Sequence, residues 1–271
     1  MQAFLFAVTI TTMDLGLEGK RALLWGASRG LGHACALALA REGVHVTLAA
    51  RTEATLVQAV AAIRKDSGRD AGHVVADITT ETGRAAALAA CPQPDILLNN
   101  ADGPMPGDFR DWTRDDWLAA LDAMMLGPIA MIRATVDGMI ARRYGRILNI
   151  ASRSVKIPQL ELGLSNGARS GLVGFTGGLA RQVVQHNVTI NNLLPGIFAT
   201  DGQRRHLHGM AHPGGKTFEQ VWAERAANTP AKRYGEPGEF GAYCAFLCSA
   251  HAGYITGQNL LVDGGSYPGT F

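Results

Sequence analysis

Short apolar segments alternate with amphipathic segments along most of the chain. The apolar segments are bounded by turn residues and mainly hydrophobic, which is typical of strands that are buried on both faces of a sheet. They are residues 21–25, 44–50, 73–77, 95–101, 146–152, 189–195 and 258–265. The pattern therefore predicts seven strands.

Between these segments, apolar residues recur with the period of a helix. The predicted helices are residues 33–43, 53–68, 81–91, 115–143, about 162–185, and 237–249. Strands that alternate with helices indicate an α/β fold, here a Rossmann-type, doubly wound, seven-stranded parallel sheet. No linker, repeat or low-complexity tract divides residues 13–271, so we expect a single domain.

Two segments stand outside the alternating pattern. Residues 198–228 predict an irregular stretch between the sixth strand and the last helix. Residues 1–12 are apolar, but they lack the basic start of a leader and are too short to cross a bilayer. We interpret them as a disordered or artificial extension, with a mobile arm that packs on a neighbouring subunit as the alternative.

The charge and cysteine content exclude several classes of partner. The formal net charge is +2, and the 25 lysines and arginines are scattered, which argues against nucleic acid and against a membrane surface. Four cysteines favour the reducing cytoplasm over a disulfide framework. Cys244 and Cys248 have the spacing of half a metal site, but no second pair lies nearby, so we expect core packing and no metal.

A glycine-rich turn follows the first predicted strand. Gly26, Gly30 and Gly32 form a G-x-x-x-G-x-G pattern between that strand and the next helix. Glycines at this position let the backbone turn tightly and approach a pyrophosphate, whose charge is stabilised at the helix N-terminus. The turn therefore predicts dinucleotide binding, with contacts from its other members Ser28, Arg29 and Leu31; the alternative is an ordinary glycine turn.

The predicted second strand ends in Arg51, where a dinucleotide-binding fold often has an acidic residue for a ribose 2′-hydroxyl. Arg29 lies within the glycine turn itself. Guanidinium groups form planar, charge-assisted hydrogen bonds to phosphate, so the pair fits a 2′-phosphate. We therefore expect NADP(H) in preference to NAD(H).

Several ordered segments resemble the short-chain dehydrogenase/reductase family, and within it the β-ketoacyl carrier-protein reductases. The resemblance covers about residues 15–265 and includes the glycine turn, VVADI, NNA, GRILNIAS, NNLLPG and ITGQNLLVDGG. It implies that Asp77 and Ile78 contact the adenine and that Asn99, Ala101, Pro195 and Gly196 lie around the cofactor.

The resemblance also implies a quaternary structure and a substrate class. It suggests a homotetramer or homodimer built on the two long helices. Residues 198–228 would form a mobile substrate lid, which covers an apolar small molecule with a carbonyl group.

The chain departs from the family pattern at the residues that carry proton transfer. Ser152 fits the family's serine, but the family's YxxxK pattern is replaced by Ser165 and Arg169, and Met124 stands where a helical asparagine is expected. A serine hydroxyl resembles water, with a pKa of about 15.7, more than phenol, with a pKa of about 10. A neighbouring cation shifts a pKa by roughly 1 to 3 units, so Arg169 cannot make Ser165 an equivalent acid.

We nevertheless assign catalytic roles to Ser152, Ser165 and Arg169. Both serines can donate hydrogen bonds to a carbonyl oxygen. Arg169 lies one helical turn from Ser165, where it can hold the nicotinamide ribose or stabilise developing negative charge.

Other acids offer replacements for the phenol, each with a simpler alternative. Asp102 can pair with Arg169 or cap its loop, and Glu161 can face the cleft or stay a solvated charge at a helix start. His206, His208 and His212 can titrate near neutral pH or belong to a mobile polar loop. Met210 and Trp222 of the same segment can cover an apolar ligand or simply pack.

Three functions follow in order of preference. The first is an NADP(H)-dependent oxidoreductase that acts on a carbonyl, or a related C=N or C=C bond, with a non-standard proton relay. The second is a catalytically silent NADP(H)-binding homologue that serves as a sensor or scaffold. The third is a lyase or isomerase that keeps the pocket without the redox step.

Overall fold

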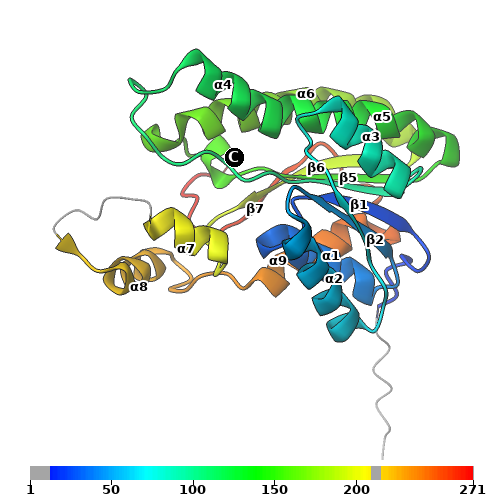
Figure 1. Cartoon of the computed structure of the whole chain (residues 1–271), viewed down its shortest axis with the longest axis horizontal. Coiled ribbons are helices and arrows are strands. Elements are labelled where there is room, and N and C mark those ends of the chain that lie inside the picture. The colour runs from blue at the N-terminus through cyan, green and yellow to red at the C-terminus, as the bar shows by residue number, and fades with distance from the viewer. Residues whose placement is uncertain (1–12, 209–214, 271) are drawn as a thin grey trace, which may run out of the picture.

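Seven parallel strands form the centre of the protein (Figure 1). The computed structural model describes residues 13–208 and 215–270, except the side chain of His206. The strands are β1 (Arg21–Trp25), β2 (His45–Ala50), β3 (Gly72–Val75), β4 (Ile96–Asn99), β5 (Gly145–Ile150), β6 (Val188–Pro195) and β7 (Asn259–Val262). They pair in the order β3-β2-β1-β4-β5-β6-β7, which confirms the predicted doubly wound sheet.

Helices cover both faces of this sheet. One face carries α1 (Gly30–Arg41), α2 (Glu53–Ser67) and α9 (Pro237–Cys248). The other carries α3 (Glu81–Ala90), α4 (Arg114–Leu121), α5 (Gly127–Arg142) and α6 (Gly163–Val183). Short turns of helix at Arg153–Val155, Leu160–Leu162, Val184–His186 and Ala250–Ala252 complete the connections.

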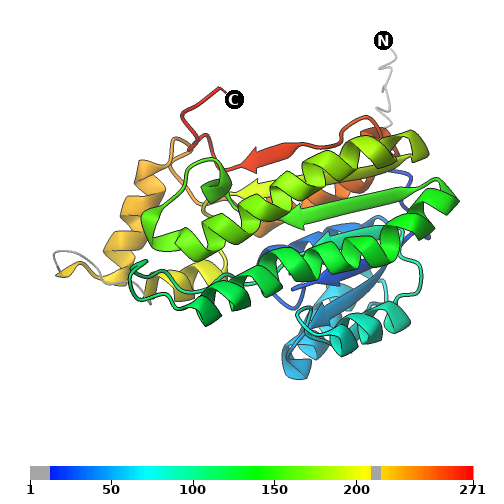
Figure 2. The ribbon, with the colours of Figure 1, turned by 90° about the horizontal axis from the view of Figure 1, so that it is seen from above.

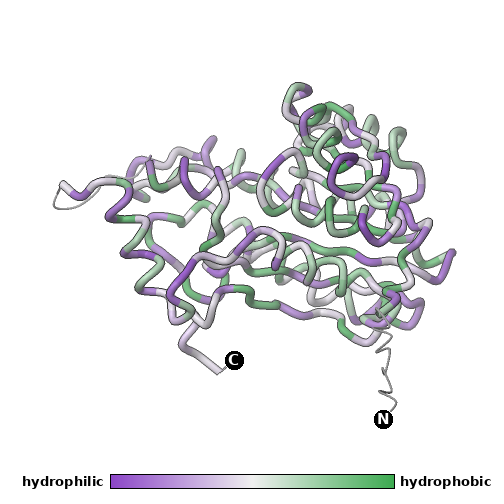
Figure 3. Tube along the Cα trace, turned by 90° about the horizontal axis from the view of Figure 1, so that it is seen from below, coloured by the Kyte–Doolittle hydropathy of each residue, from purple (hydrophilic) through white to green (hydrophobic). Residues whose placement is uncertain are grey.

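Helices on both faces bury the central strands, which explains why these strands are mainly apolar, whereas β3 at the edge of the sheet is largely exposed (Figure 3). Leu39, Leu56 and Phe240 pack with the sheet on the α1/α2/α9 face. Met131, Ile132 and Val183 pack on the opposite face. All four cysteines are buried, and Cys35, Cys244 and Cys248 belong to the first of these clusters, as expected for core packing.

The predicted helix at 115–143 is interrupted by one wide turn. Asp122–Leu126 forms a π-helical segment between α4 and α5, and its buried residue is Met124. Figure 2 shows α4 and α5 running alongside α6. The continuous run Arg114–Arg142 is long and apolar enough to cross a membrane, but its inner face packs on the sheet, as in the core helix of a globular protein.

A row of asparagines, three of them buried and the fourth partly buried, crosses the sheet at one level. Asn99, Asn149, Asn192 and Asn259 are aligned neighbours on β4, β5, β6 and β7. Each amide nitrogen of the first three donates to the amide oxygen of the next across 2.9 Å. The side chains thereby add a second set of hydrogen bonds between the strands.

The prediction of an irregular stretch at 198–228 is wrong for much of its length. The segment contains α7 (Asp201–His208) and α8 (Phe218–Asn228). Thr217 and Gln220 form a capping box at the start of α8, a signal that the sequence carries as T-x-x-Q. We keep the name lid for residues 198–228, whose movement stays a prediction.

Ring contacts join α7 to α8, and α8 to the chain that follows the lid. His208 stacks on Phe218 with ring centroids 4.1 Å apart, and Trp222 stacks on Tyr234 at 3.8 Å. The guanidinium of Arg204 lies 4.4 Å from the centre of the Trp222 ring. The predicted roles of residues 1–12, Met210 and His212, and of the His206 side chain, lie outside the described residues.

Candidate active site

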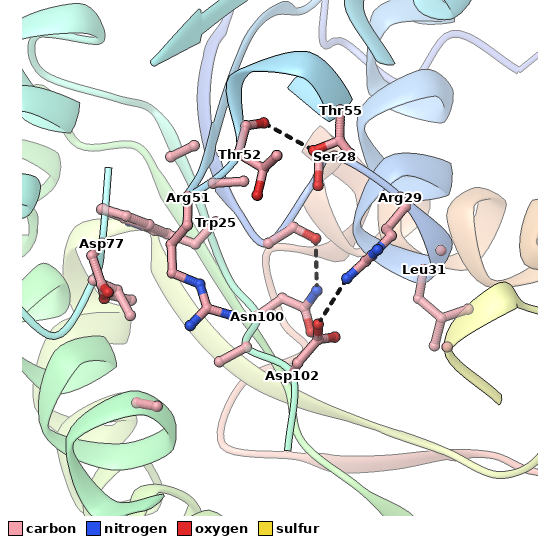
Figure 4. A pocket seen from close by; sticks show the side chains of 18 of the residues that line it. Trp25, Ser28, Arg29, Leu31, Arg51, Thr52, Thr55, Asp77, Asn100 and Asp102 are labelled. Atoms are coloured by element: carbon pink, nitrogen blue, oxygen red, sulfur yellow. Dashed lines mark hydrogen bonds and ion pairs between the residues drawn. The ribbon is translucent and has the colours of Figure 1, made fainter. Parts of the chain in front are cut away.

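A cavity of about 310 Å³ opens where β1 and β2 end and α1 begins (Figure 4). It lies at the switch point of the sheet, where neighbouring β1 and β4 lead their chains to opposite faces. The predicted contacts that line it are Gly26, Ser28, Arg29, Gly30, Leu31, Arg51, Asp77, Ile78 and Ala101. We call it the dinucleotide cavity.

The glycines of the turn serve different purposes. Gly26 and Gly30 have φ values of +61° and +60°, which favour glycine. A Cβ on Gly32 would lie 2.4 Å from the carbonyl oxygen of Gly26, so Gly32 lets α1 pack closely on the turn. Gly32 does not line the dinucleotide cavity, and its predicted direct contact with a cofactor stays a prediction.

The start of α1 is open to an anion. Arg29 occupies the N-cap position and makes no side-chain capping bond, and the first-turn residues Gly30 and Leu31 line the cavity. Amide groups at a helix N-terminus that lack a cap favour a phosphate in their place. The cavity therefore has the features that a pyrophosphate requires.

Asp77 forms hydrogen bonds with Thr79 in the wall of the dinucleotide cavity. Its carboxylate accepts hydrogen bonds from the amide of Thr79 at 2.9 Å and from the hydroxyl of Thr79 at 2.8 Å. These bonds, the backbone one foremost, lower the pKa of Asp77 below its usual value. The carboxylate thus stays ionised beside the space expected for an adenine.

Asn100, rather than Asn99, reaches the cavity. The side chain of Asn100 lines it and donates to the carbonyl oxygen of Gly26 across 3.0 Å. Asn99 is only 2% exposed and belongs to the asparagine row inside the sheet. Asn99 therefore does not line the cavity, because its side chain bonds to Asn149 within the sheet, and its predicted contact with a cofactor stays a prediction.

A second cavity of about 400 Å³ adjoins the first. Both are lined by Arg29, Leu31, Asn100, Ala101, Asp102, Thr200, Gly202, Gln203 and Arg205. The second cavity also brings together the predicted residues Ser152, Ser165, Arg169, Pro195 and Gly196. We call it the substrate cavity.

Arg169 is the most constrained side chain of this cavity. Its Nε donates to Oγ of Ser165 at 3.1 Å, Nη1 to the carbonyl oxygen of Ile150 at 2.7 Å, and Nη2 to that of Ala101 at 3.0 Å. Burial lowers the pKa of Arg169 to about 10, opposed by the charge of Asp102, so the guanidinium is still protonated at neutral pH. It joins α6 to the ends of β4 and β5.

Ser152 lies on the turn after β5 and is held in place by Ser154. Its Oγ accepts hydrogen bonds from the amide of Ser154 at 3.1 Å and from the Ser154 hydroxyl at 2.9 Å. Because both bonds are accepted, the proton of Ser152 remains available for donation to a ligand. The sequence analysis did not identify Ser154 as the hydrogen-bond partner of Ser152.

Met124, Ser165 and Arg169 converge around Gly103. A Cβ on Gly103 would lie 3.7 Å from Oγ of Ser165, 3.8 Å from Nη2 of Arg169 and 3.9 Å from Sδ of Met124. The π-helical turn therefore directs a thioether, which carries no proton, toward the candidate catalytic groups.

Of the two carboxylates predicted to replace the phenol as proton donor, only Asp102 lines the cavities. Asp102 lies 3.5 Å from Arg29 in a largely exposed ion pair and forms no ion pair with Arg169, which corrects the suggested partnership. Glu161 lies in a short helical turn and is absent from the described lining of either cavity. Among the described lining residues, Asp102 is therefore the one carboxylate shared by both cavities.

Several lining residues were missed by the sequence analysis. They are Trp25, Thr52, Thr55 and Asn100 in the first cavity, and Thr200, Gln203, Arg205 and Arg225 from the lid. Thr52 and Thr55 had a signal, since they follow Arg51 at the end of β2. The lid residues had none, because their approach depends on how α7 and α8 fold over the sheet.

Comparison with known proteins places this geometry in a family. A model described as enoyl-(acyl carrier protein) reductase matches residues 26–267. The chain is 33% identical over 259 residues to a 3-oxoacyl-[acyl-carrier-protein] reductase of Vibrio harveyi, covering 93% of this chain and 99% of that protein. It is 31% identical to an acetoacetyl-CoA reductase of Cupriavidus necator, covering 92% of this chain and 98% of that protein.

A solved structure gives the same result for the fold. L-sorbose reductase from Gluconobacter frateurii, complexed with NADPH and L-sorbose, superposes with a TM-score of 0.88 at 28% identity. The match covers 95% of this chain and all of that chain. Together with the parallel sheet and the glycine turn at its switch point, these similarities show that the chain belongs to the short-chain dehydrogenase/reductase family of NAD(P)-dependent oxidoreductases.

Proposed function

We propose that the protein is an NADP(H)-dependent oxidoreductase that transfers hydride to or from a carbonyl, or a related C=N or C=C bond, with a non-standard proton relay. The observation that carries this proposal is the shared wall of the two cavities. The dinucleotide cavity opens directly onto the substrate cavity, where hydroxyl groups of Ser152 and Ser165 are gathered. A bound nicotinamide cofactor would supply the hydride.

The preference for NADP(H) rests on the arginines of the dinucleotide cavity. Arg51 extends into the cavity from the end of β2, and Arg29 contributes from the glycine turn (Figure 4). Arg205 of α7 also lines the cavity. Among the described residues, Arg51 and Arg205 form no ion pair with a carboxylate. Both are exposed, and the charge of Arg51 also acts on Asp77. Their guanidinium groups are therefore free to bind a phosphate, as in a 2′-phosphorylated dinucleotide.

The proposed relay has Ser165 and Arg169 in the positions of the family's tyrosine and lysine. Ser152 donates its hydrogen bond to the substrate oxygen, and Arg169 stabilises negative charge near Ser165 through its buried guanidinium. Neither serine can replace a phenol as the acid, because its pKa is several units too high. We therefore assign the transferred proton to water that enters the substrate cavity.

A specific observation also favours a second candidate, a catalytically silent NADP(H)-binding homologue. Three of the five N–H groups of Arg169 are already bonded to Ile150, Ala101 and Ser165. Such bonding suits a residue that fixes the ends of β4 and β5 as much as one that acts on a substrate.

We further propose that the protein is a cytoplasmic homodimer or homotetramer. The face formed by α4, α5 and α6 exposes Trp117, Leu118, Leu126 and Phe175. On α6, a Cβ added to Gly174, Gly177 or Gly178 would meet nothing within 4 Å. Exposed apolar residues beside glycines allow two helices to approach closely, which fits a contact between subunits.

Titration of the full-length protein with NADPH and NADH, followed by absorbance of the reduced cofactor against ketones, aldehydes, imines and enones, tests the proposal. We expect tighter binding of NADPH and its oxidation by at least one member of the panel. The Ser152→Ala variant should bind NADPH normally and lose turnover. Binding without oxidation across the panel would support the silent homologue, and absence of binding would refute both candidates.

A further inference from the structure

The substrate cavity is strongly cationic. Its charged lining residues are Arg29, Asp102, Arg153, Arg169, Arg205 and Arg225, which are five arginines and one aspartate among the described residues. The overall charge of the chain is only +2, so this concentration of positive charge is local. An apolar substrate alone would leave most of these guanidinium groups without a counter-charge.

Three of the arginines have a function apart from the substrate. Arg29 pairs with Asp102, and Arg169 is bonded to two carbonyl oxygens and to Ser165. Arg205 also lines the dinucleotide cavity, where a cofactor phosphate would neutralise it. Arg153 and Arg225 are left, since they line the substrate cavity and not the dinucleotide cavity.

Arg153 and Arg225 reach the cavity from separate parts of the fold. Arg153 begins the short turn that directly follows Ser152, whereas Arg225 lies on α8 in the lid. Both are partly buried, and neither forms an ion pair within residues 13–208 and 215–270. A partly buried guanidinium gains from an opposite charge that enters its cavity, and these two arginines have none within the described part of the chain, so they are available to an anionic group of the ligand.

We propose that the substrate bears an oxyanion, a carboxylate or a phosphate ester, that Arg153 and Arg225 bind. Guanidinium groups match the planar geometry of these anions with paired hydrogen bonds. The apolar residues of the same cavity, Leu31, Met105, Leu162 and Phe198, contact the remainder of the molecule. The substrate class is therefore an amphiphilic oxo acid, an oxo phosphate, or the corresponding alcohol.

Because Arg225 lies on α8, the anion would also bridge the lid and the core. Arg153 adjoins Ser152 just beyond the end of β5, whereas Arg225 belongs to the lid. Binding of the anionic end would thus fix α8 over the cavity. The carbonyl part of this inference rests on the proposed function, but the binding of the anion does not require turnover.

Calorimetric titration with matched anionic and neutral ligands tests the inference. The probes are levulinate and its methyl ester, and dihydroxyacetone phosphate and dihydroxyacetone, each with and without saturating NADP⁺. We expect at least one anion to bind about tenfold or more tightly than its neutral partner, as charge-assisted hydrogen bonds to arginine imply. The tighter of the two anions identifies the carboxylate or the phosphate.

Substitutions of the two arginines distinguish specific binding of the anion from non-specific electrostatic attraction to the cavity. Arg153→Gln and Arg225→Gln should each weaken binding of the anion about tenfold and leave binding of the neutral probe and of NADP⁺ unchanged. Arg225→Lys should restore part of the affinity. Arg64→Gln, which removes an exposed arginine of α2 outside both cavities, is the control and should change nothing.

Each outcome bears on a different claim. Equal affinity for anionic and neutral probes, no binding of either anion at millimolar concentration, or equal loss for both probes in the variants would overturn the inference. Arginine-dependent anion binding without oxidation of NADPH by any substrate would keep the inference and refute the proposed function. Oxidation of NADPH by ketones, together with binding of the anionic probes that neither arginine variant changes, would keep the proposed function and refute the inference.

Discussion

Nε of Arg169 donates a hydrogen bond to Oγ of Ser165, one helical turn earlier on α6, across 3.1 Å. Both side chains are buried, at 9% and 8% exposure. The bond fixes the guanidinium so that its other two nitrogens reach the carbonyl oxygens of Ile150 and Ala101. One residue pair thus connects the helix to the two strand ends that border the substrate cavity.

Removing this connection should destabilise the fold. Arg169→Ala leaves two buried carbonyl oxygens unpaired, so we expect the free energy of unfolding to fall by about 2–4 kcal/mol. Ser165→Ala removes one bond to a charged donor and should cost about 1–2 kcal/mol. Urea titration measures both. Arg181→Ala, at an exposed position of the same helix, is the control; an equal effect there would mean that the buried bonds contribute nothing.

Restoring the family's residues should separate the two candidate functions. The double variant Ser165→Tyr with Arg169→Lys brings back a phenol and an ammonium group, which suit proton transfer near neutral pH. If the protein is an enzyme with its own relay, the variant loses the native reaction while it still binds NADPH. Absorbance of the reduced cofactor provides the measurement. A gain of ketone reductase activity from an inactive parent would instead identify a silent homologue.

Cofactor preference should depend on Arg51. Arg51→Gln removes a guanidinium from the dinucleotide cavity, so we expect the Kd for NADPH to rise about 10- to 100-fold, the value of a charged hydrogen bond. The Kd for NADH, which lacks the 2′-phosphate, should stay the same. Fluorescence titration with both cofactors measures the change. A parallel loss for NADPH and NADH would show that Arg51 does not distinguish the two.

The ion pair between Arg233 and Glu239, at the start of α9, should stabilise the protein less in acid. Glu239 forms two hydrogen bonds with Arg233, at 2.7 and 2.8 Å, and mainly for this reason its pKa is lowered from 4.5 to about 2. Its contribution to stability is therefore complete above pH 4.5 and is lost as the pH falls toward 2. We expect a small difference in urea midpoint between the native protein and Glu239→Gln that is constant near neutral pH and shrinks below 4.5. A difference that grew in acid would contradict the assignment.

The exposed face of α6 should hold subunits together. Phe175 is 40% exposed on that helix, and Phe175→Glu places a charge in the expected contact. We expect light scattering to show a smaller oligomer for this variant. Val57→Glu is the matched control, because Val57 is 50% exposed on α2, on the opposite side of the sheet. A monomeric parent protein, or equal dissociation in both variants, would rule out this surface.

The sequence predicted the sheet well because a strand buried on both faces is mainly apolar. The entire β5 and nearly all of β6 are buried, and both were predicted within a residue or two of their ends. The lid was mispredicted in part for the opposite reason. Strongly polar α7 has no apolar stripe in its sequence. In α8, Phe218, Val221, Trp222 and Ala226 do recur at helical spacing, a signal that the sequence analysis overlooked.

The candidate site shows the same division between local and long-range information. The glycine turn and Arg51 could be predicted, because their position at strand ends is determined by the local chain. The alignment of Asn99 with Asn149 could not, since it depends on the register between two strands. Arg225 was missed because nothing near it in the sequence indicates that α8 faces Ser152.

The asparagine row has a consequence for how the sheet reaches a single arrangement. Apolar side chains on neighbouring parallel strands pack nearly as well after a shift by two residues, because the same face stays inward. Asn99, Asn149, Asn192 and Asn259 do not tolerate such a shift, since every buried amide would then lose its partner. The row therefore fixes the register of β4 to β7 relative to one another. Because the register is fixed, Ala101, Ser152 and Pro195, which lie at or just beyond the ends of their strands, all reach the substrate cavity.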